Sequence, residues 1–288
     1  MKKKLGCFLL AVLLILSPIT VLADAVVGDT IVVLGADLTD EERGQMLQQF
    51  KASDQAQIVE VTNAEEHQYL DGVIPQAQIG SIAISSVSIT YTSKDSGLNV
   101  KVSKNINYIS KDTYTNALMT AGVKDADIIV SSPFEVSGTA ALTGIMKAYE
   151  ISTGEPISDE VKKVANEEMI TTQELADEIG DEKASDVINA IKKEIAEKKP
   201  QTTEEIQNII NNINNNYNIN LTPEQSQQLL NLFDKMKDAN INWDELSNQL
   251  QKYSDKAGAF LASPEGKSFL QNIKDVFSAF IDWISSLF

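Results

Sequence analysis

Several small polar residues stand between a short apolar strand and a helix, at a place where a ligand could be held. The apolar run at 127–131 predicts a strand, and the segment from about 137 to 150, rich in Gly, Ala and Thr, predicts a helix. Backbone N–H groups and the helix dipole at such a junction can bind an anion. The residues expected to line this pocket are Ser131, Ser132, Ser137, Gly138 and Thr139, with Asp37 from the end of the first predicted strand.

The same residues have a simpler structural interpretation. No Lys occupies the position expected of a phosphate-binding loop, and there is no G-x-G-x-x-G motif. Ser137 would then be an ordinary N-cap, and Gly144 would let the helix pack closely on the sheet. The sequence leaves both interpretations open.

Histidine and cysteine are too scarce for the commonest metal sites. His67 is the only histidine, and the single cysteine, Cys7, falls in a predicted signal peptide. Zinc and most transition-metal sites need clusters of these residues, so we expect no metal site and no cofactor. A Ser–His–acid triad would have to use His67, but the chain has no G-x-S-x-G motif. We therefore expect His67 to be an ordinary histidine on a surface helix.

Carboxylates are abundant but form no recognisable pattern. With 41 Asp and Glu in the chain, pairs at the spacing that a glycosidase needs arise by chance. No D-x-[DN]-x-[DN]-G calcium loop is present, and the segment 124–127 is interpreted as a turn. An extracellular hydrolase using carboxylates, or a serine in the 131–139 turn, is therefore an alternative and not the main interpretation.

Residues 1–23 have the pattern of a secretory signal peptide. Lys2, Lys3 and Lys4 precede an almost unbroken apolar run, and Ala23 ends a cleavage pattern. Cleavage there leaves a chain without cysteine and takes the formal net charge from −17 to −20, because three lysines are removed. We expect a secreted protein, either retained at the cell envelope or released, with no integral membrane span after cleavage. The rival interpretation is a retained membrane anchor.

The acidity of the chain limits its partners. Nucleic acid is not expected as a partner, because its phosphates require Lys and Arg. Electrostatic binding to anionic lipids or wall polymers is disfavoured for the same reason. The charge is enough to keep an exported protein soluble, and a cationic partner is the alternative.

Residues 24–153 are predicted to form an α/β domain. The expected strands lie at 30–34, 57–62, 79–92, 98–102 and 127–131. Thr39 with Glu42 predicts a capping box at the start of the first helix, and Asn63 is expected to cap the second.

The pairing of the central strands is also predicted. The turn sequence Lys94-Asp95-Ser96-Gly97 predicts a hairpin between the strand that ends near Thr92 and the strand from Leu98. The strand at 127–131 is expected to be buried on both faces. Because the hairpin interrupts any βαβ series, we expect a mixed sheet with covering helices and not a regular Rossmann fold.

Residues 154–288 are predicted to be helical. Helices are expected at about 155–169, from Thr171 onward, and at 181–198, 203–213, 222 onward, 242–261 and 264–288. The asparagine-rich run at 211–220 is expected to be a linker, since asparagine favours turns over helix interiors. The fold class is therefore α+β or α/β, with an N-terminal mixed sheet followed by an all-helical C-terminal region.

The C-terminal segment has a wide apolar face. Its candidate interaction residues are Phe277, Phe280, Trp283, Ile284 and Phe288. Packing on the other helices, self-association, a partner groove and membrane contact would each use such a face.

Two segments resemble a known family. They are DAVVGDTIVVLGADLTDEER at 24–43 and NALMTAGVKDADIIVSSPFEVSGTAALTGIMKAYE at 116–150. They are similar to the exported domain-of-unknown-function family 1002 of Gram-positive bacteria, the YpuA-like proteins. The resemblance implies an exported, envelope-associated protein, and it carries no assigned activity and no agreed catalytic residues.

These observations favour a non-catalytic binding or interaction protein at the cell envelope. The expected partner is an envelope protein or a wall component, with possible self-association through the C-terminal helix. The alternatives are the extracellular hydrolase described above and a self-assembling structural protein.

Overall fold

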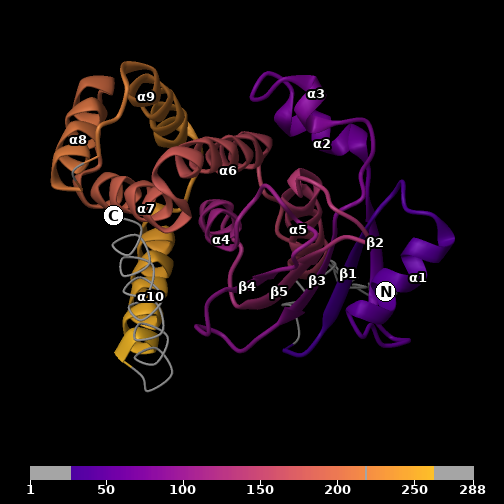
Figure 1. Ribbon diagram of the computed structural model, residues 1–288. Helices are drawn as coiled ribbons and strands as arrows, with labels where there is room; N and C mark the ends of the chain where they lie inside the picture. The colour runs from indigo at the N-terminus through magenta and orange to yellow at the C-terminus, as the bar shows by residue number, and fades with distance from the viewer. Residues whose placement is uncertain (1–26, 218, 263–288) are drawn as a thin grey trace, which may run out of the picture.

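The computed structural model describes residues 27–217 and 219–262, in which a mixed five-stranded sheet is followed by a series of helices (Figure 1). The strands are β1 (Thr30–Gly35), β2 (Gln57–Val61), β3 (Ser86–Tyr91), β4 (Asn99–Val102) and β5 (Ala126–Ser131). The predicted signal peptide at 1–23 and the candidate interaction residues Phe277, Phe280, Trp283, Ile284 and Phe288 lie outside the described residues. No helix in the described part of the chain is long and apolar enough to cross a membrane.

The sheet has the strand order β2-β1-β3-β5-β4. β1 is parallel to β2 and β5 is parallel to β4, while β3 runs antiparallel to both of its neighbours. The predicted mixed sheet is confirmed. All strands except β3 therefore have their carboxyl ends at the same edge of the sheet, which we call the carboxyl edge; the opposite edge is the amino edge.

The predicted hairpin is wrong. β3 does not pair with β4, because Val87 already pairs with Val33 of β1 on one side and with Val130 of β5 on the other. β4 instead lies beyond β5, with Val100 opposite Ile128. The turn sequence directs the chain out of β3, but both edges of β3 are occupied by strands that are distant in sequence.

Five helices belong to the first half of the chain. They are α1 (Asp40–Gln49), α2 (Asn63–Leu70), the short α3 (Gln76–Ile79), α4 (Lys111–Thr120) and α5 (Thr139–Thr153). The capping box of Thr39 and Glu42 is confirmed. Thr62, and not Asn63, caps α2, because the Thr62 hydroxyl accepts a hydrogen bond from Glu65 N and the Glu65 side chain reciprocates.

One face of the sheet carries the main hydrophobic core. Ile31 and Val33 of β1 point into this core with α4 and α5, while Val32 and Leu34 point the other way into a smaller cluster with Met46 of α1. α5 lies close to the strands, since a Cβ on Gly144 would come within 2.9 Å of the Val33 Cγ1 atom. The expected close-packing role of Gly144 is confirmed.

β5 is buried on one face only, which corrects the prediction. Ile128 and Val130 are fully buried, whereas Asp127 is exposed and Ile129 keeps 37% of its surface exposed. Side chains of a strand alternate between faces, and only the face beneath α4 and α5 is fully covered at β5.

The described residues from 159 to 262 form helices that pack around a core of their own. They are α6 (Asp159–Ile179), α7 (Asp181–Lys198), α8 (Thr203–Asn216), α9 (Pro223–Asp238) and α10 (Trp243–Ala262). α6 is one helix of 21 residues capped by Ser158, so the predicted boundary near Thr171 is wrong. Thr171 is buried within it, and the apolar positions continue through Leu175.

The predicted asparagine-rich linker is largely helix. Residues 211–216 complete α8, and only the segment from 217 to 222 connects α8 to α9. Ile206, Ile209, Ile210 and Ile213 form one buried face of α8. Burial of this isoleucine face outweighs the weak helix propensity of asparagine.

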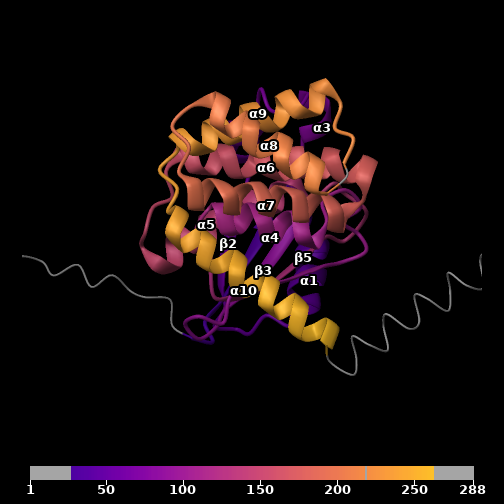
Figure 2. The same cartoon turned by 90° about the vertical axis from the view of Figure 1, so that its left-hand side faces the viewer.

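The two halves share a core. Ala165, Met169 and Ile170 of α6, with Leu246 and Leu250 of α10, pack into the core on the sheet. α10 runs below α7 and across α4 (Figure 2). The main core therefore takes side chains from both sides of residue 153, the predicted domain boundary.

Candidate functional site

The carboxyl edge of the sheet brings together the residues that the sequence selected. Asp37 follows β1, Ser131 ends β5, Ser132 follows it, and 137–139 form the start of α5. Since β1 and β5 run in the same direction, all of these residues lie along one edge. β3 lies between β1 and β5, so one strand separates Asp37 from Ser131 along this edge.

Their polar atoms are occupied by internal hydrogen bonds. Asp37 Oδ2 accepts a bond of 2.7 Å from Ala83 N. Ser131 Oγ accepts from Gln49 Nε2 at 2.7 Å and donates to Ser103 Oγ at 2.9 Å. Ser132 Oγ donates to the carbonyl oxygens of Asn105 and Phe134. Both serines are fully buried, so these hydroxyls tie β5 to neighbouring loops.

The N-terminus of α5 is capped by Gly138 and not by Ser137. Gly138 has φ of +97°, and no side chain makes the cap bond. Ser137 Oγ lies 3.3 Å from Thr139 Oγ1, which donates to Glu66. Burial raises the pKa of Glu66, although the bond from Thr139 opposes the shift. The junction is thus a hydrogen-bonded structural turn, and ligand binding there stays a prediction.

His67 does not form a pair with a serine. Its Nδ1 atom lies 2.8 Å from Asp71 Oδ1, and its Nε2 atom lies 3.1 Å from the carbonyl oxygen of Gly80. The hydrogen bond to Asp71 raises the pKa of His67. Both ring nitrogens are therefore engaged by groups that cannot act as a nucleophilic hydroxyl.

A different candidate site lies at the amino edge of the sheet. There a hollow of about 460 Å³ opens between the end of α5, the loops that flank β3 and β5, and α10. Its size falls within the range of about 300–1,000 Å³ typical of small-molecule sites. We call it the α5–α10 hollow. Its principal side chains are Tyr91, Lys94, Asp95, Lys124, Asp125, Tyr149, Glu155, Glu245, Gln249 and Lys252.

Charges of both signs line the α5–α10 hollow. Lys252 Nζ lies 2.6 Å from Asp95 Oδ1, which links α10 to the loop after β3. This ion pair lowers the pKa of Asp95 and raises that of Lys252. Lys124 Nζ and Glu245 Oε1 are 3.9 Å apart, a looser pair. Both pairs join α10 to loops at the amino edge of the sheet, and each places an ammonium group beside a carboxylate.

Two tyrosines form the inner part of the hollow. Tyr91 and Tyr149 are mostly buried, and the Tyr91 hydroxyl lies 2.5 Å from Ser152 Oγ. Burial, with smaller contributions from carboxylates beginning with Glu155, raises the pKa of Tyr149 to about 12. Both hydroxyls therefore stay protonated at neutral pH.

Gln249 is the most unusual member of the lining. Its side chain is 6% exposed, and within the described part of the chain its Nε2 atom has no hydrogen-bond partner. A buried amide N–H without an acceptor costs about 1–3 kcal/mol. An acceptor on a bound ligand would remove that cost.

Sequence reasoning did not find this hollow. Its lining comes from loops and helices spread between Val27 and Lys252. The segments 94–97 and 124–127 were interpreted only as turns, which is where Asp95 and Asp125 adopt positive φ. Nothing in the local pattern of α10 indicates that Gln249 would face them.

The described residues contain no group of three or more His, Cys, Asp or Glu side chains that could hold a metal ion.

Comparison with known proteins shows that most of the chain matches one family. The family described as "Protein of unknown function (DUF1002)" matches residues 34–253. The chain is 50% identical to "Uncharacterized protein YpuA" of Bacillus subtilis (strain 168) over 285 residues, which is 99% of this chain and 98% of that protein. No solved structure matches. Apart from Val27, the lining of the α5–α10 hollow falls within the matched residues.

Proposed function

Since the chain belongs to the family described as "Protein of unknown function (DUF1002)", we propose a function from the geometry of its own residues. The protein is an exported, non-catalytic binding protein, and its α5–α10 hollow holds a small zwitterionic ligand, an amino acid or a short peptide. The observation that carries the proposal is that lysine and carboxylate side chains line one hollow of about 460 Å³ together with Tyr91 and Tyr149.

The charges of the lining support a zwitterionic ligand. A purely anionic ligand would be repelled by Asp125, Glu155 and Glu245. A purely cationic ligand would be repelled by the lysines of the same lining. A molecule that carries both an ammonium and a carboxylate can complement both sets. Because charged groups pair best at short range and in a low dielectric, a partly enclosed hollow favours this arrangement.

The role proposed for Gln249 is to turn its side-chain amide and donate a hydrogen bond from Nε2 to a carbonyl or carboxylate oxygen of the ligand. An amide N–H aimed at a ligand carbonyl or carboxylate gains a hydrogen bond that the empty protein lacks. The rings of Tyr91 and Tyr149 would cover the apolar part of the ligand.

The hydrogen bonds made by the candidate serines and by His67 favour binding over catalysis. The serine hydroxyls at the carboxyl edge and both nitrogens of His67 are engaged in structural hydrogen bonds. A nucleophile needs a base within reach, and these contacts supply no such pair. The hydrolase alternative therefore has less support than binding.

The place of action rests on the sequence. The signal-peptide pattern at 1–23 supports export, and the candidate partners remain an envelope protein or a wall component. Self-association through the C-terminal residues is tested by measuring mass as a function of concentration with the full chain and with a chain ending at Ser263.

Titration calorimetry with the purified protein tests the proposal. The ligands are a panel of free amino acids and dipeptides, each dipeptide also in N-acetylated and C-amidated forms. Zwitterionic members should bind, and blocking either end should weaken binding because one charge is lost.

Variants of α10 make the test specific. Gln249→Ala should weaken binding at least about fivefold, the value of one hydrogen bond. Gln251→Ala is the matched control, since Gln251 lies on the exposed side of α10, where its Nε2 atom donates to Asp255 Oδ1. Equal binding of blocked and free ligands, or no effect of Gln249→Ala, would contradict the proposal.

A further inference from the structure

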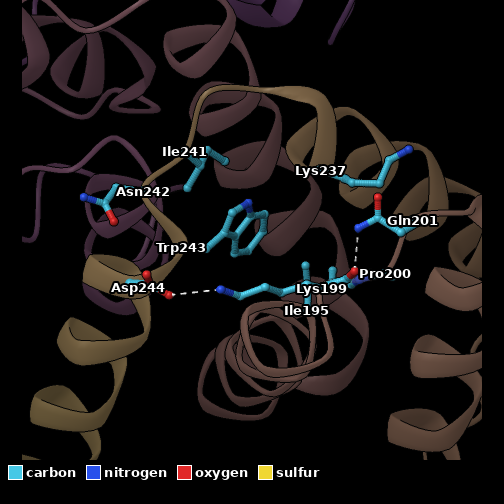
Figure 3. A pocket seen from close by; sticks show the side chains of 9 residues that line it. All are labelled: Ile195, Lys199, Pro200, Gln201, Lys237, Ile241, Asn242, Trp243 and Asp244. Atoms are coloured by element: carbon cyan, nitrogen blue, oxygen red, sulfur yellow. Dashed lines mark hydrogen bonds and ion pairs between the residues drawn. The ribbon is translucent and has the colours of Figure 1, made fainter.

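A second hollow, of about 370 Å³, lies entirely within the helical half (Figure 3). It is formed by the end of α7, the connection to α8, the end of α9 and the start of α10. No residue lines both this hollow and the α5–α10 hollow. We call it the Trp243 hollow.

The indole ring of Trp243 occupies the centre of the Trp243 hollow in Figure 3. Trp243 is partly buried and packs against side chains of both hydrophobic cores. Ile195, Pro200 and Ile241 add apolar surface around the ring. The hollow thus presents an aromatic ring held in place by the cores behind it.

Amide side chains stand on the rim. Gln201 Nε2 donates to the carbonyl oxygen of Lys199 at 2.8 Å, which positions the Gln201 amide at the end of α7. Asn242 Oδ1 accepts from Glu245 N at 3.1 Å at the start of α10. Each amide carries both donors and acceptors, the combination that hydroxyl groups require.

The charged residues of the rim are already paired. Lys199 Nζ lies 3.5 Å from Asp244 Oδ1, an ion pair drawn across the lower side of Figure 3. Lys237 Nζ lies 3.1 Å from Asp238 Oδ1 and 3.4 Å from Asp234 Oδ1. An anionic ligand would have to compete with these carboxylates, and the whole chain has a formal net charge of −17. The hollow therefore suits a neutral ligand.

We propose that the Trp243 hollow binds a neutral sugar, as a single residue or a short oligosaccharide. A pyranose ring has one face of C–H groups, which stacks on an aromatic ring, and an edge of hydroxyl groups, which bonds to amides. A purely apolar ligand would leave the amides without hydrogen-bond partners. A charged ligand would have to compete with the ion pairs of the rim. This site and its ligand are independent of the proposal for the α5–α10 hollow.

Fluorescence of Trp243 gives a direct test in the full chain. The sequence has two tryptophans, Trp243 and Trp283, so a Trp283→Phe background leaves one reporter. The probes are tri-N-acetylglucosamine and maltotriose, added up to about 10 mM, which is enough to detect a Kd of about 1 mM. We expect a saturable change in emission with at least one probe, and the probe that binds identifies the kind of sugar.

A rim variant separates the site from the general stability of the protein. Gln201→Ala removes an exposed amide without touching the core, and it should weaken binding about fivefold. Gln227→Ala, an exposed glutamine on α9 outside the hollow, should leave binding unchanged. Trp243→Phe, followed by calorimetry, should weaken binding while preserving much of the core packing.

Two results would overturn the proposal. One is the absence of any emission change with either sugar over the full concentration range. The other is a saturable change that Gln201→Ala and Trp243→Phe both leave unaffected. Amino acids and peptides are proposed to bind in the α5–α10 hollow, so Gln201→Ala should not alter their binding. Failure of one proposal can therefore be distinguished from failure of the other.

Discussion

Lys192 Nζ lies 2.7 Å from Glu168 Oε1, and both side chains are fully buried. Lys192 comes from α7 and Glu168 from α6. Lys192 also donates to the carbonyl oxygen of Asn116 and to Thr120 Oγ1 of α4, and Thr120 donates to Glu168. This network joins the helical half to a helix that covers the sheet, so it links the two parts of the chain.

Removal of one member of this pair should be strongly destabilising. Burial lowers the pKa of Lys192 and raises that of Glu168, and each opposes the other's shift. Lys192→Met leaves a buried carboxylate without its cation and should lower the free energy of unfolding by about 3–5 kcal/mol. Urea-induced unfolding followed by circular dichroism measures this change.

Two further variants make that result specific. The double variant Lys192→Met with Glu168→Leu should be less destabilised than Lys192→Met alone, because no charge is left unpaired. Lys193→Met alters the exposed neighbour and should change stability by less than about 0.5 kcal/mol. A double variant that is less stable than Lys192→Met alone would show that the unpaired charge is not the source of the effect.

Substitution at Gly144 should reveal how closely α5 packs on the sheet. A Cβ there would meet Val33 Cγ1 at 2.9 Å and Val61 Cγ1 at 3.5 Å. Gly144→Ala should therefore cost about 1–3 kcal/mol, despite the better helix propensity of alanine. Gly44→Ala in α1 is the control: nothing lies within 4 Å of its Cβ, so it should stabilise by about 0.5–1 kcal/mol. Thermal unfolding of both variants distinguishes packing from propensity, and stabilisation by both would contradict the packing argument.

The buried Glu66 should make stability depend on pH. Burial raises its pKa above the ordinary value of 4.5, so the folded protein holds this proton more tightly than the unfolded chain does. Stability from this group is present below pH 4.5 and is lost as pH rises towards the folded pKa. Relative to Glu66→Gln, the wild type should therefore lose stability over that interval.

The measurement for Glu66 is the free energy of unfolding of both proteins at a series of pH values. The difference between wild type and Glu66→Gln should change with pH in the stated direction. Glu197→Gln, at an exposed position on α7, should show a flat difference. A flat difference for Glu66→Gln as well would mean that its pKa is not raised in the folded protein.

Serine substitutions should separate a true helix cap from a neighbouring residue. Ser158 accepts from Val161 N at the start of α6, at 3.3 Å, so Ser158→Ala should cost about 1 kcal/mol. Ser137 makes no cap bond to α5, so Ser137→Ala should cost less than about 0.5 kcal/mol. Urea unfolding compares them directly. A larger loss for Ser137→Ala than for Ser158→Ala would restore Ser137 as the cap.

The parts of the fold that sequence reasoning predicted depend on contacts between near neighbours. The capping box of Thr39 with Glu42 involves two residues that are three apart in the sequence, and it is present. The continuous apolar run of β1 and the helical spacing in α7 were also enough to place those elements. Turns, caps and hydrophobic periodicity depend on residues that are close in sequence, so they can be recognised from the sequence directly.

The predicted site was only partly informative for the same reason. Asp37 and the residues at 131–139 follow β1 and β5, whose carboxyl ends lie at the same edge of the sheet, with β3 between the two strands. The hydrogen bonds of their hydroxyl groups involve Gln49, Asn105 and Glu66, which are distant in sequence. Sequence patterns could therefore not show which hydroxyls have a partner. The α5–α10 hollow, built from residues between 27 and 252, had no local signal at all.

The amino-acid sequence alone was enough to predict the family, the mixed α and β composition and most boundaries of helices and strands. These features depend on short-range patterns and on segments that resemble the family. Only the tertiary structure decided that β5 separates β3 from β4 and that the asparagine-rich run completes α8. It also decided that Gln249 of α10 faces the amino edge of the sheet. The physical reason is that these outcomes follow from which buried surfaces meet across long separations in sequence, where burial outweighs local propensity.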